Sequence, residues 1–72
     1  MTIHSQLLRH RIEVLSDREE RGSLIRILDD LETIENAMPE IEGTRLAARA
    51  RWLRDCLNNE LSGRLAKAEA ST

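Results

Sequence analysis

Apolar residues recur at helical spacing along most of the chain, and the clearest pattern lies in its middle. In the segment that begins at Asp17, steps of three and four positions alternate from Leu24 to Met38, and Leu28 lies next to Ile27. These apolar positions are Leu24, Ile27, Leu28, Leu31, Ile34 and Met38. Such spacing keeps the side chains on one face of a helix and is typical of helices that pack against one another. It predicts a long helix over about 17–37 with one buried stripe.

A second long stripe follows Pro39. It comprises Leu46, Ala50, Leu53, Leu57, Leu61 and Leu65, and Ala68 continues it. The fixed φ of proline suits the first position of a helix, so we expect a helix over about 40–68. The connection between the two long helices would then be Asn36-Ala37-Met38-Pro39. A connection this short makes two helices run antiparallel.

The first segment is shorter and predicts a helix over about 3–15, in which Leu8, Ile12 and Leu15 share one face. Ser16 and Glu19 then have the spacing of a capping box, which favours a new helix starting near Asp17. The alternative is one uninterrupted helix with Ser16 on its surface. The sequence leaves both possibilities open.

Composition supports an all-helical protein. Ala, Glu, Lys, Leu and Arg make up 38 of the 72 residues, and Trp52 is the only aromatic residue. We therefore expect a single domain over 1–72, built as an antiparallel helical hairpin with a short N-terminal helix. The expected core of this hairpin and of its dimer is Leu24, Ile27, Leu28, Leu31, Ile34, Leu46, Leu53, Leu57 and Leu61.

A chain of this length buries little surface by itself. With one cysteine it cannot form an internal disulfide. We expect the core to be completed by a second copy, giving a dimeric four-helix bundle, or by a partner protein.

Charge is divided between the two long helices. The stretch 28–44 carries six acids and no base, whereas the stretch 45–54 carries four arginines and no acid. In an antiparallel hairpin these stretches lie opposite each other, so we expect ion pairs across it. Exposed pairs contribute only about 0–1 kcal/mol each, so they would orient the hairpin more than stabilise it.

Candidate chemistry is sparse, and we expect no enzyme, no metal and no cofactor. The sequence has no glycine-rich phosphate loop and no plausible Ser-His-Asp set. His4 and His10 have no acid at ligand spacing, so we expect both to be exposed and unmetallated. Cys56, at the edge of a stripe, is expected to be a buried thiol.

No apolar run approaches the roughly 18 residues of a membrane span, and the first residues do not resemble a signal peptide. The lone cysteine fits a reducing compartment. We therefore expect a cytoplasmic protein.

Trp52 lies well away from the stripe of its own helix, on the same side as Ile41 and Ala48. Two interpretations remain. The first segment folds back over Trp52, or the strip formed by Ile41, Ala48 and Trp52 binds a partner, for which Trp is a favoured anchor. The run Arg45, Arg49, Arg51 and Arg54 allows a third, weaker interpretation, a nucleic-acid face without stacking aromatics.

Over about residues 1–66 the layout resembles the small E-type needle co-chaperones of type III secretion, the YscE, PscE and SsaE group. The resemblance consists of a Met-Thr start, a short leucine-bearing segment, and Ser16-Asp17-Arg18-Glu19-Glu20-Arg21-Gly22 leading into Leu24-Ile25-Arg26-Ile27-Leu28. Pro39 and the stripe from Leu46 to Leu65 follow. Several members of the group have a tyrosine early in the last helix, where this chain has Ile41-Glu42-Gly43-Thr44.

The resemblance implies a helical hairpin that pairs with a chaperone built of tetratricopeptide-like repeats. That pair would hold the needle subunit unpolymerised in the cytoplasm. The alternative from another class is a small dimeric helical regulator or inhibitor that binds another protein or, less plausibly, RNA.

Overall fold

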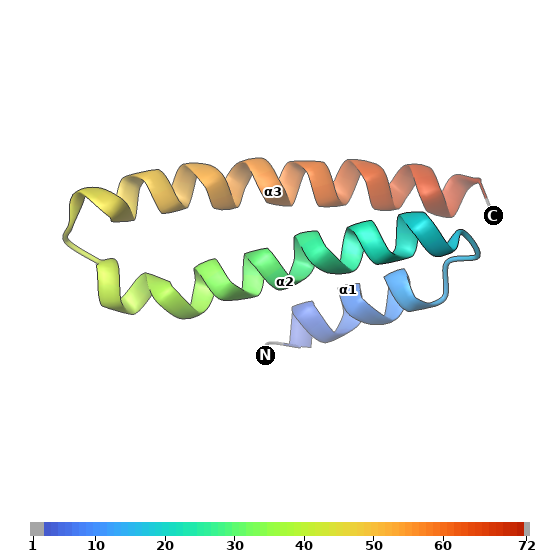
Figure 1. Ribbon diagram of the computed structural model, residues 1–72, viewed down its shortest axis with the longest axis horizontal. Helices are drawn as coiled ribbons and strands as arrows, with labels where there is room; N and C mark the ends of the chain where they lie inside the picture. Colours follow the sequence, from blue (N-terminus) through green and yellow to red (C-terminus); the bar gives the residue numbers. More distant parts are fainter. Residues whose placement is uncertain (1–2, 72) are drawn as a thin grey trace.

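Three helices make up the part of the chain that the computed structural model describes, which is residues 3–71, with side chains from residue 5. They are α1 (Ile3–Glu13), α2 (Arg18–Ile41) and α3 (Arg45–Ala70), and no strand occurs among these residues. In Figure 1, α2 and α3 lie side by side and antiparallel, and α1 lies along α2. The prediction of a helical hairpin with a short N-terminal helix is confirmed.

The break between α1 and α2 is present, and Asp17 makes it. The Asp17 carboxylate accepts hydrogen bonds from the backbone amides of Glu19 (3.0 Å) and Glu20 (3.1 Å), which would otherwise lack partners at a helix start. The guanidinium of Arg21 donates to the carbonyl of Leu15 (2.8 Å) and closes the turn. The predicted break is therefore confirmed, whereas the cap is Asp17 and not Ser16.

The connection between α2 and α3 lies later in the chain than predicted. Helix α2 does not stop at Ala37 but continues through Pro39 to Ile41. A proline lacks one backbone N–H, but its fixed φ is compatible with a helix. The lost hydrogen bond would have gone to the carbonyl of Glu35, an exposed residue within reach of water.

Gly43 makes the turn itself. It has φ of +85°, a left-handed conformation that glycine adopts without strain. Thr44 then donates from both its amide (3.0 Å) and its hydroxyl to the carbonyl of Ile41, which satisfies an unpaired acceptor at the end of α2. Helix α3 therefore begins at Arg45 and not near residue 40.

The buried core lies at the end of the molecule where all three helices meet. Its members are Ile12, Leu15, Leu24, Ile27, Leu28, Leu31, Leu61 and Leu65. Five of the nine predicted core residues are buried here: Leu24, Ile27, Leu28, Leu31 and Leu61. Ile34 and Leu57 are half-buried. Helix α1 supplies Ile12 and Leu15, which the predicted core did not include.

Leu46 and Leu53, which were predicted for the core of the hairpin or of its dimer, are not buried within the single hairpin. Their side chains are 61% and 44% exposed, while Ala47 is only 2% exposed. The reason lies in the spacing of the α3 leucines: from Leu53 to Leu65 every step is four residues. Each such step turns the stripe by about 40° around the helix. One packed face therefore cannot bury both ends of the stripe.

Ion pairs join α1 to both long helices, and Arg64 on α3 binds Glu20 on α2 (3.0 Å). Arg9 binds Asp29 (2.8 Å) and Glu32 (3.1 Å) on α2, and Arg11 binds Glu69 on α3 (2.6 Å). The predicted pairing of the 28–44 acids with the arginines of α3 is only partly present. It consists of Arg51 with Glu42 (3.2 Å) and Arg54 with Glu35 (3.9 Å).

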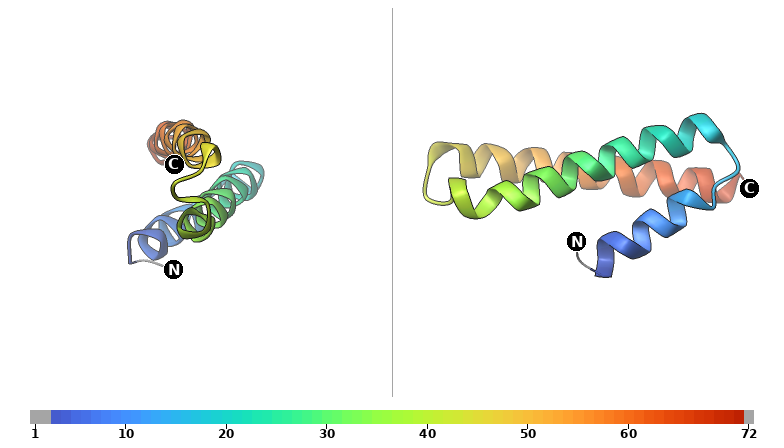
Figure 2. Two further views of the ribbon diagram at one scale, coloured as in Figure 1. Left: turned by 90° about the vertical axis from the view of Figure 1, so that its left-hand side faces the viewer. Right: turned by 60° about the horizontal axis from the view of Figure 1, so that its bottom comes forward.

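The molecule is elongated, about 43 × 20 × 16 Å, and its two ends differ. We call the end near the α1–α2 turn the closed half, because three helices pack there. The end near the α2–α3 turn has only two helices, since α1 stops partway along α2 (Figures 1 and 2). We call it the open half. Any surface available for a partner should therefore be sought first in the open half.

Candidate docking surface

A shallow apolar hollow of about 360 Å³ lies between α2 and α3 in the open half. We call it the apolar groove and define it by its lining residues, Ile41, Leu46, Arg49, Ala50, Trp52 and Leu53. Ile41 comes from the last turn of α2 and the other five from the first turns of α3. The late end of α2 is what brings Ile41 beside them.

Three large apolar side chains in this groove are exposed to solvent. Trp52 is 65% exposed, Leu46 61% and Leu53 44%. Five large apolar side chains among the described residues are exposed. These three lie together, whereas Leu7 lies in α1 and Val14 directly after it, much earlier in the chain. Scattered exposed leucines need no explanation, but a contiguous apolar patch that includes a tryptophan marks an interaction surface.

The groove lies on the same face of the hairpin as Arg64 and Ser23, which are hydrogen-bonded to each other. On α3, Arg64 identifies the side that faces the groove, because it lies 18 residues, or about five full turns, after Leu46. Arg64 therefore points in nearly the same direction as Leu46. Its hydrogen-bond partner Ser23 (2.8 Å) lies the same 18 residues before Ile41 on α2. Both walls of the groove thus share a face with the Arg64–Ser23 contact.

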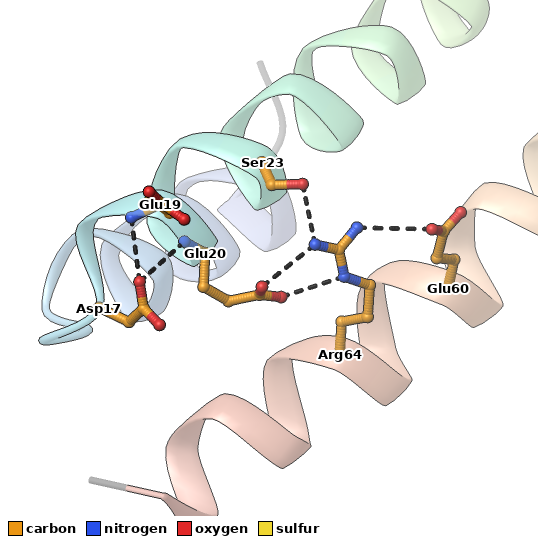
Figure 3. Close-up of polar contacts among 6 residues, drawn as sticks. All are labelled: Asp17, Glu19, Glu20, Ser23, Glu60 and Arg64. Atoms are coloured by element: carbon orange, nitrogen blue, oxygen red, sulfur yellow. Dashed lines mark hydrogen bonds and ion pairs between the residues drawn. The ribbon is translucent and has the colours of Figure 1, made fainter.

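That contact is part of a polar cluster at the closed end of the same face, shown in Figure 3. The Arg64 guanidinium binds the Glu20 carboxylate through two nitrogens (3.0 and 3.2 Å) and reaches Glu60 at 3.5 Å. These hydrogen bonds, chiefly the one to Glu20, raise the pKa of Arg64 above its usual range. The face is therefore polar and self-paired at the closed end and apolar at the open end.

Two arginines border the groove without ion pairs. Arg51 and Arg54 have carboxylate partners, but Arg45 and Arg49 have none within 4.0 Å among the described residues. Both are exposed, and Arg49 lines the groove itself. The groove is therefore apolar with an uncompensated positive rim.

The structure brings together two of the three residues predicted to bind a partner. Ile41 and Trp52 both line the groove, while Ala48 is exposed on α3 outside it. Helix α1 does not cover Trp52, so the interpretation in which the first segment buries it is wrong. Leu46 and Leu53 were not predicted as residues of this surface, and Arg49 was considered only as part of a nucleic-acid face. The four-residue spacing of the α3 leucines was the signal that could have placed Leu53 outside the core.

Residues with potential chemistry form no cluster. Cys56 is exposed, so the prediction of a buried thiol is wrong. His10 is exposed, while the His4 side chain lies outside the described residues. Over the part of the chain that the structure describes, no group of three or more His, Cys, Asp or Glu residues has the arrangement of a metal site. None of the described helices combines the length and apolar character that crossing a membrane requires.

Comparison with protein families, curated proteins and solved structures found no match for this chain. Its function is therefore argued from the groove and from the sequence resemblance.

Proposed function

We propose that this chain is a cytoplasmic co-chaperone of type III secretion that acts by helix packing. It would dock on a chaperone of tetratricopeptide-like repeats, stabilise it and so keep the needle subunit unpolymerised. The observation that carries the proposal is the exposure of Leu46, Trp52 and Leu53 on one groove of a two-helix hairpin. The identity of the partner class rests on the resemblance of the sequence.

The mechanism is stoichiometric burial of apolar surface. A groove between two antiparallel helices accepts a third helix, because side chains on the incoming helix fit between the ridges of both. Removing exposed apolar area from water contributes roughly 25 cal/mol per Å². A chaperone helix bound in this groove would be the third helix of the open half, just as α1 is the third helix of the closed half.

Co-purification from native cytosol tests the proposal, with the chain carrying an affinity tag. We expect a helical-repeat protein and a small helical subunit to be recovered with it in stoichiometric amounts. Trp52→Ala should reduce that recovery by tenfold or more, because tryptophan truncation at an interface typically costs about 2 kcal/mol or more. Val14→Ala is the matched control, since Val14 is equally exposed but lies outside the groove.

Circular dichroism separates a binding defect from a folding defect. The helicity of Trp52→Ala should equal that of the wild type, because the Trp52 side chain is mostly in water. A loss of helicity would assign Trp52 to the core. Recovery of the partners at wild-type levels with Trp52→Ala would overturn the proposal.

A second candidate function is a small dimeric regulator that binds another protein or RNA, and the unpaired Arg45 and Arg49 favour it. Salt distinguishes the RNA version from helix docking. Binding through arginine–phosphate contacts weakens steeply with salt, in proportion to the number of contacts. Apolar docking changes little, so a complex that survives high salt supports the co-chaperone.

A further inference from the structure

We propose that the apolar groove takes an amphipathic helix whose apolar ridge is flanked by carboxylates. The inference rests on the proposed function and specifies the chemistry of the partner segment that enters the groove. It starts from Arg45 and Arg49, the two arginines of α3 without ion pairs among the described residues. Arg49 lines the groove, and Arg45 lies about one helical turn before it, next to Leu46 in the chain.

The apolar part of the groove decides the shape of the occupant. Leu46 and Leu53 are seven residues apart, or about two turns, and Ala50 between them is small and half-buried. Large side chains two turns apart with a small one between them leave a hollow for a ridge of side chains. An α-helix with apolar residues three and four positions apart presents such a ridge.

Arg45 and Arg49 determine which charges the incoming helix should carry beside its apolar ridge. A helix seated over Leu46 and Leu53 would cover part of Arg49, which lines the same hollow. Covering a cation without a counter-charge is unfavourable. Within the described residues no carboxylate lies within 4.0 Å of Arg45 or Arg49, and Glu42 and Glu35 pair instead with Arg51 and Arg54. The incoming helix must therefore supply the carboxylates.

Basic side chains beside the apolar ridge of the incoming helix would weaken its binding for the same reason. Lysines beside its apolar ridge would face Arg45 and Arg49, and like charges across an interface disfavour the wrong partner. The groove would thus select by charge among helices with similar apolar ridges.

A pair of peptides tests this directly on the full-length chain. Both are N-acetylated, C-amidated and about five turns long, with leucines at three- and four-residue spacing. One carries glutamates beside the leucine ridge and the other carries lysines. Trp52 is the only aromatic residue of the protein and lines the groove, so the shift of its fluorescence emission reports occupancy.

For the wild type we expect the glutamate-flanked peptide to bind about three- to tenfold more tightly than the lysine-flanked one, the range for two exposed ion pairs. The double variant Arg45→Glu, Arg49→Glu should reverse this preference. A matched control is Arg18→Glu, Arg26→Glu, which makes the same change in net charge at two exposed arginines of α2 away from the groove. It should keep the wild-type preference.

The outcomes separate this inference from the proposed function. Equal binding of both peptides would overturn the selection by charge and leave helix docking in the groove intact. Failure of both peptides to shift Trp52 emission would overturn docking as well. The groove could instead be filled by a second copy of the chain. A dimer in sedimentation that neither peptide dissociates would show this and would also overturn the assignment of a carboxylate-flanked partner helix.

Discussion

At the scale of single residues, Asp17 shows how one side chain decides where a helix begins. It satisfies two amides of the first turn of α2, and the acids Glu19 and Glu20 beside it also suit the positive end of the helix dipole. We predict that Asp17→Ala lowers the free energy of unfolding by about 1 kcal/mol. Ser16→Ala should change it by less than about 0.5 kcal/mol. Urea unfolding of both variants measures the difference, and a larger loss for Ser16→Ala would contradict this cap.

Arg11 and Glu69 make the stability of the closed half depend on pH. Two hydrogen bonds, 2.6 and 3.0 Å long, join them and hold the pKa of Glu69 below its ordinary value of 4.5. Because the folded-state pKa is the lower one, the pair stabilises the protein above about pH 4.5. This contribution is lost as the pH falls through the lowered pKa.

Thermal unfolding across this pH range tests the pair. We predict that the wild type melts at a slightly higher temperature than Glu69→Gln at pH 7, and that the gap closes in acid. Glu40→Gln is the control, since Glu40 is exposed and makes no ion pair within the described residues. Its melting temperature should follow that of the wild type at every pH. A gap for Glu69→Gln that persists well below pH 4 would show that the ion pair is not its cause.

At the scale of elements, the turn between α2 and α3 depends on one glycine, while the helices carry two others. Gly43 has φ of +85°, whereas Gly22 and Gly63 lie inside α2 and α3. A Cβ added at any of the three would meet no atom within 4 Å. The effect of alanine at each position is therefore set by the backbone alone.

Alanine should accordingly have opposite effects at these positions. We predict that Gly43→Ala destabilises the protein by about 1 kcal/mol, since it forces a Cβ into the left-handed region. Gly22→Ala and Gly63→Ala should each stabilise it by about 0.5–1 kcal/mol, because alanine favours helix. Chemical denaturation of the three variants measures these changes. Stabilisation by Gly43→Ala would mean that the turn has another conformation.

The buried face of α2 was predicted almost completely and that of α3 only in its second half, and the spacings of their apolar residues explain why. The alternating steps of α2 keep Leu24, Ile27 and Leu31 on one face over its whole buried length. The repeated four-residue steps of α3 carry Leu65 into the core and turn Leu53 toward water. Ala47, which is 2% exposed, takes the inner position instead.

At the scale of the whole molecule, the unequal halves predict weak self-association. The open half leaves Leu46, Trp52 and Leu53 exposed to solvent, and a second hairpin placed groove to groove would cover them. The association should be weak, because the unpaired arginines of the two copies would also face each other. We predict reversible dimerisation in the micromolar range, which Leu53→Glu abolishes. Leu7→Glu, an equally drastic change at an exposed leucine of α1, should leave it intact.

Sedimentation equilibrium measures this association, and Trp52 emission reports whether the groove takes part. A chain that stays monomeric over the whole micromolar range would contradict the prediction. So would a dimer in which Trp52 emission does not change, because the contact would then lie elsewhere.

The sequence by itself determined the helical class and the buried stripe of α2, because alternating apolar spacing acts over a few residues. It favoured the break near Asp17 but left an uninterrupted helix possible. Only the tertiary structure decided that α2 continues through Pro39 to Ile41, and that Arg9 binds Asp29 and Glu32. It also decided that Trp52 stays in water. The end of α2 at Ile41 depends on the turn that Gly43 and Thr44 make. The other two features depend on where α1 lies on the hairpin and on the direction in which the leucine stripe of α3 turns, which are relations between segments distant in the chain.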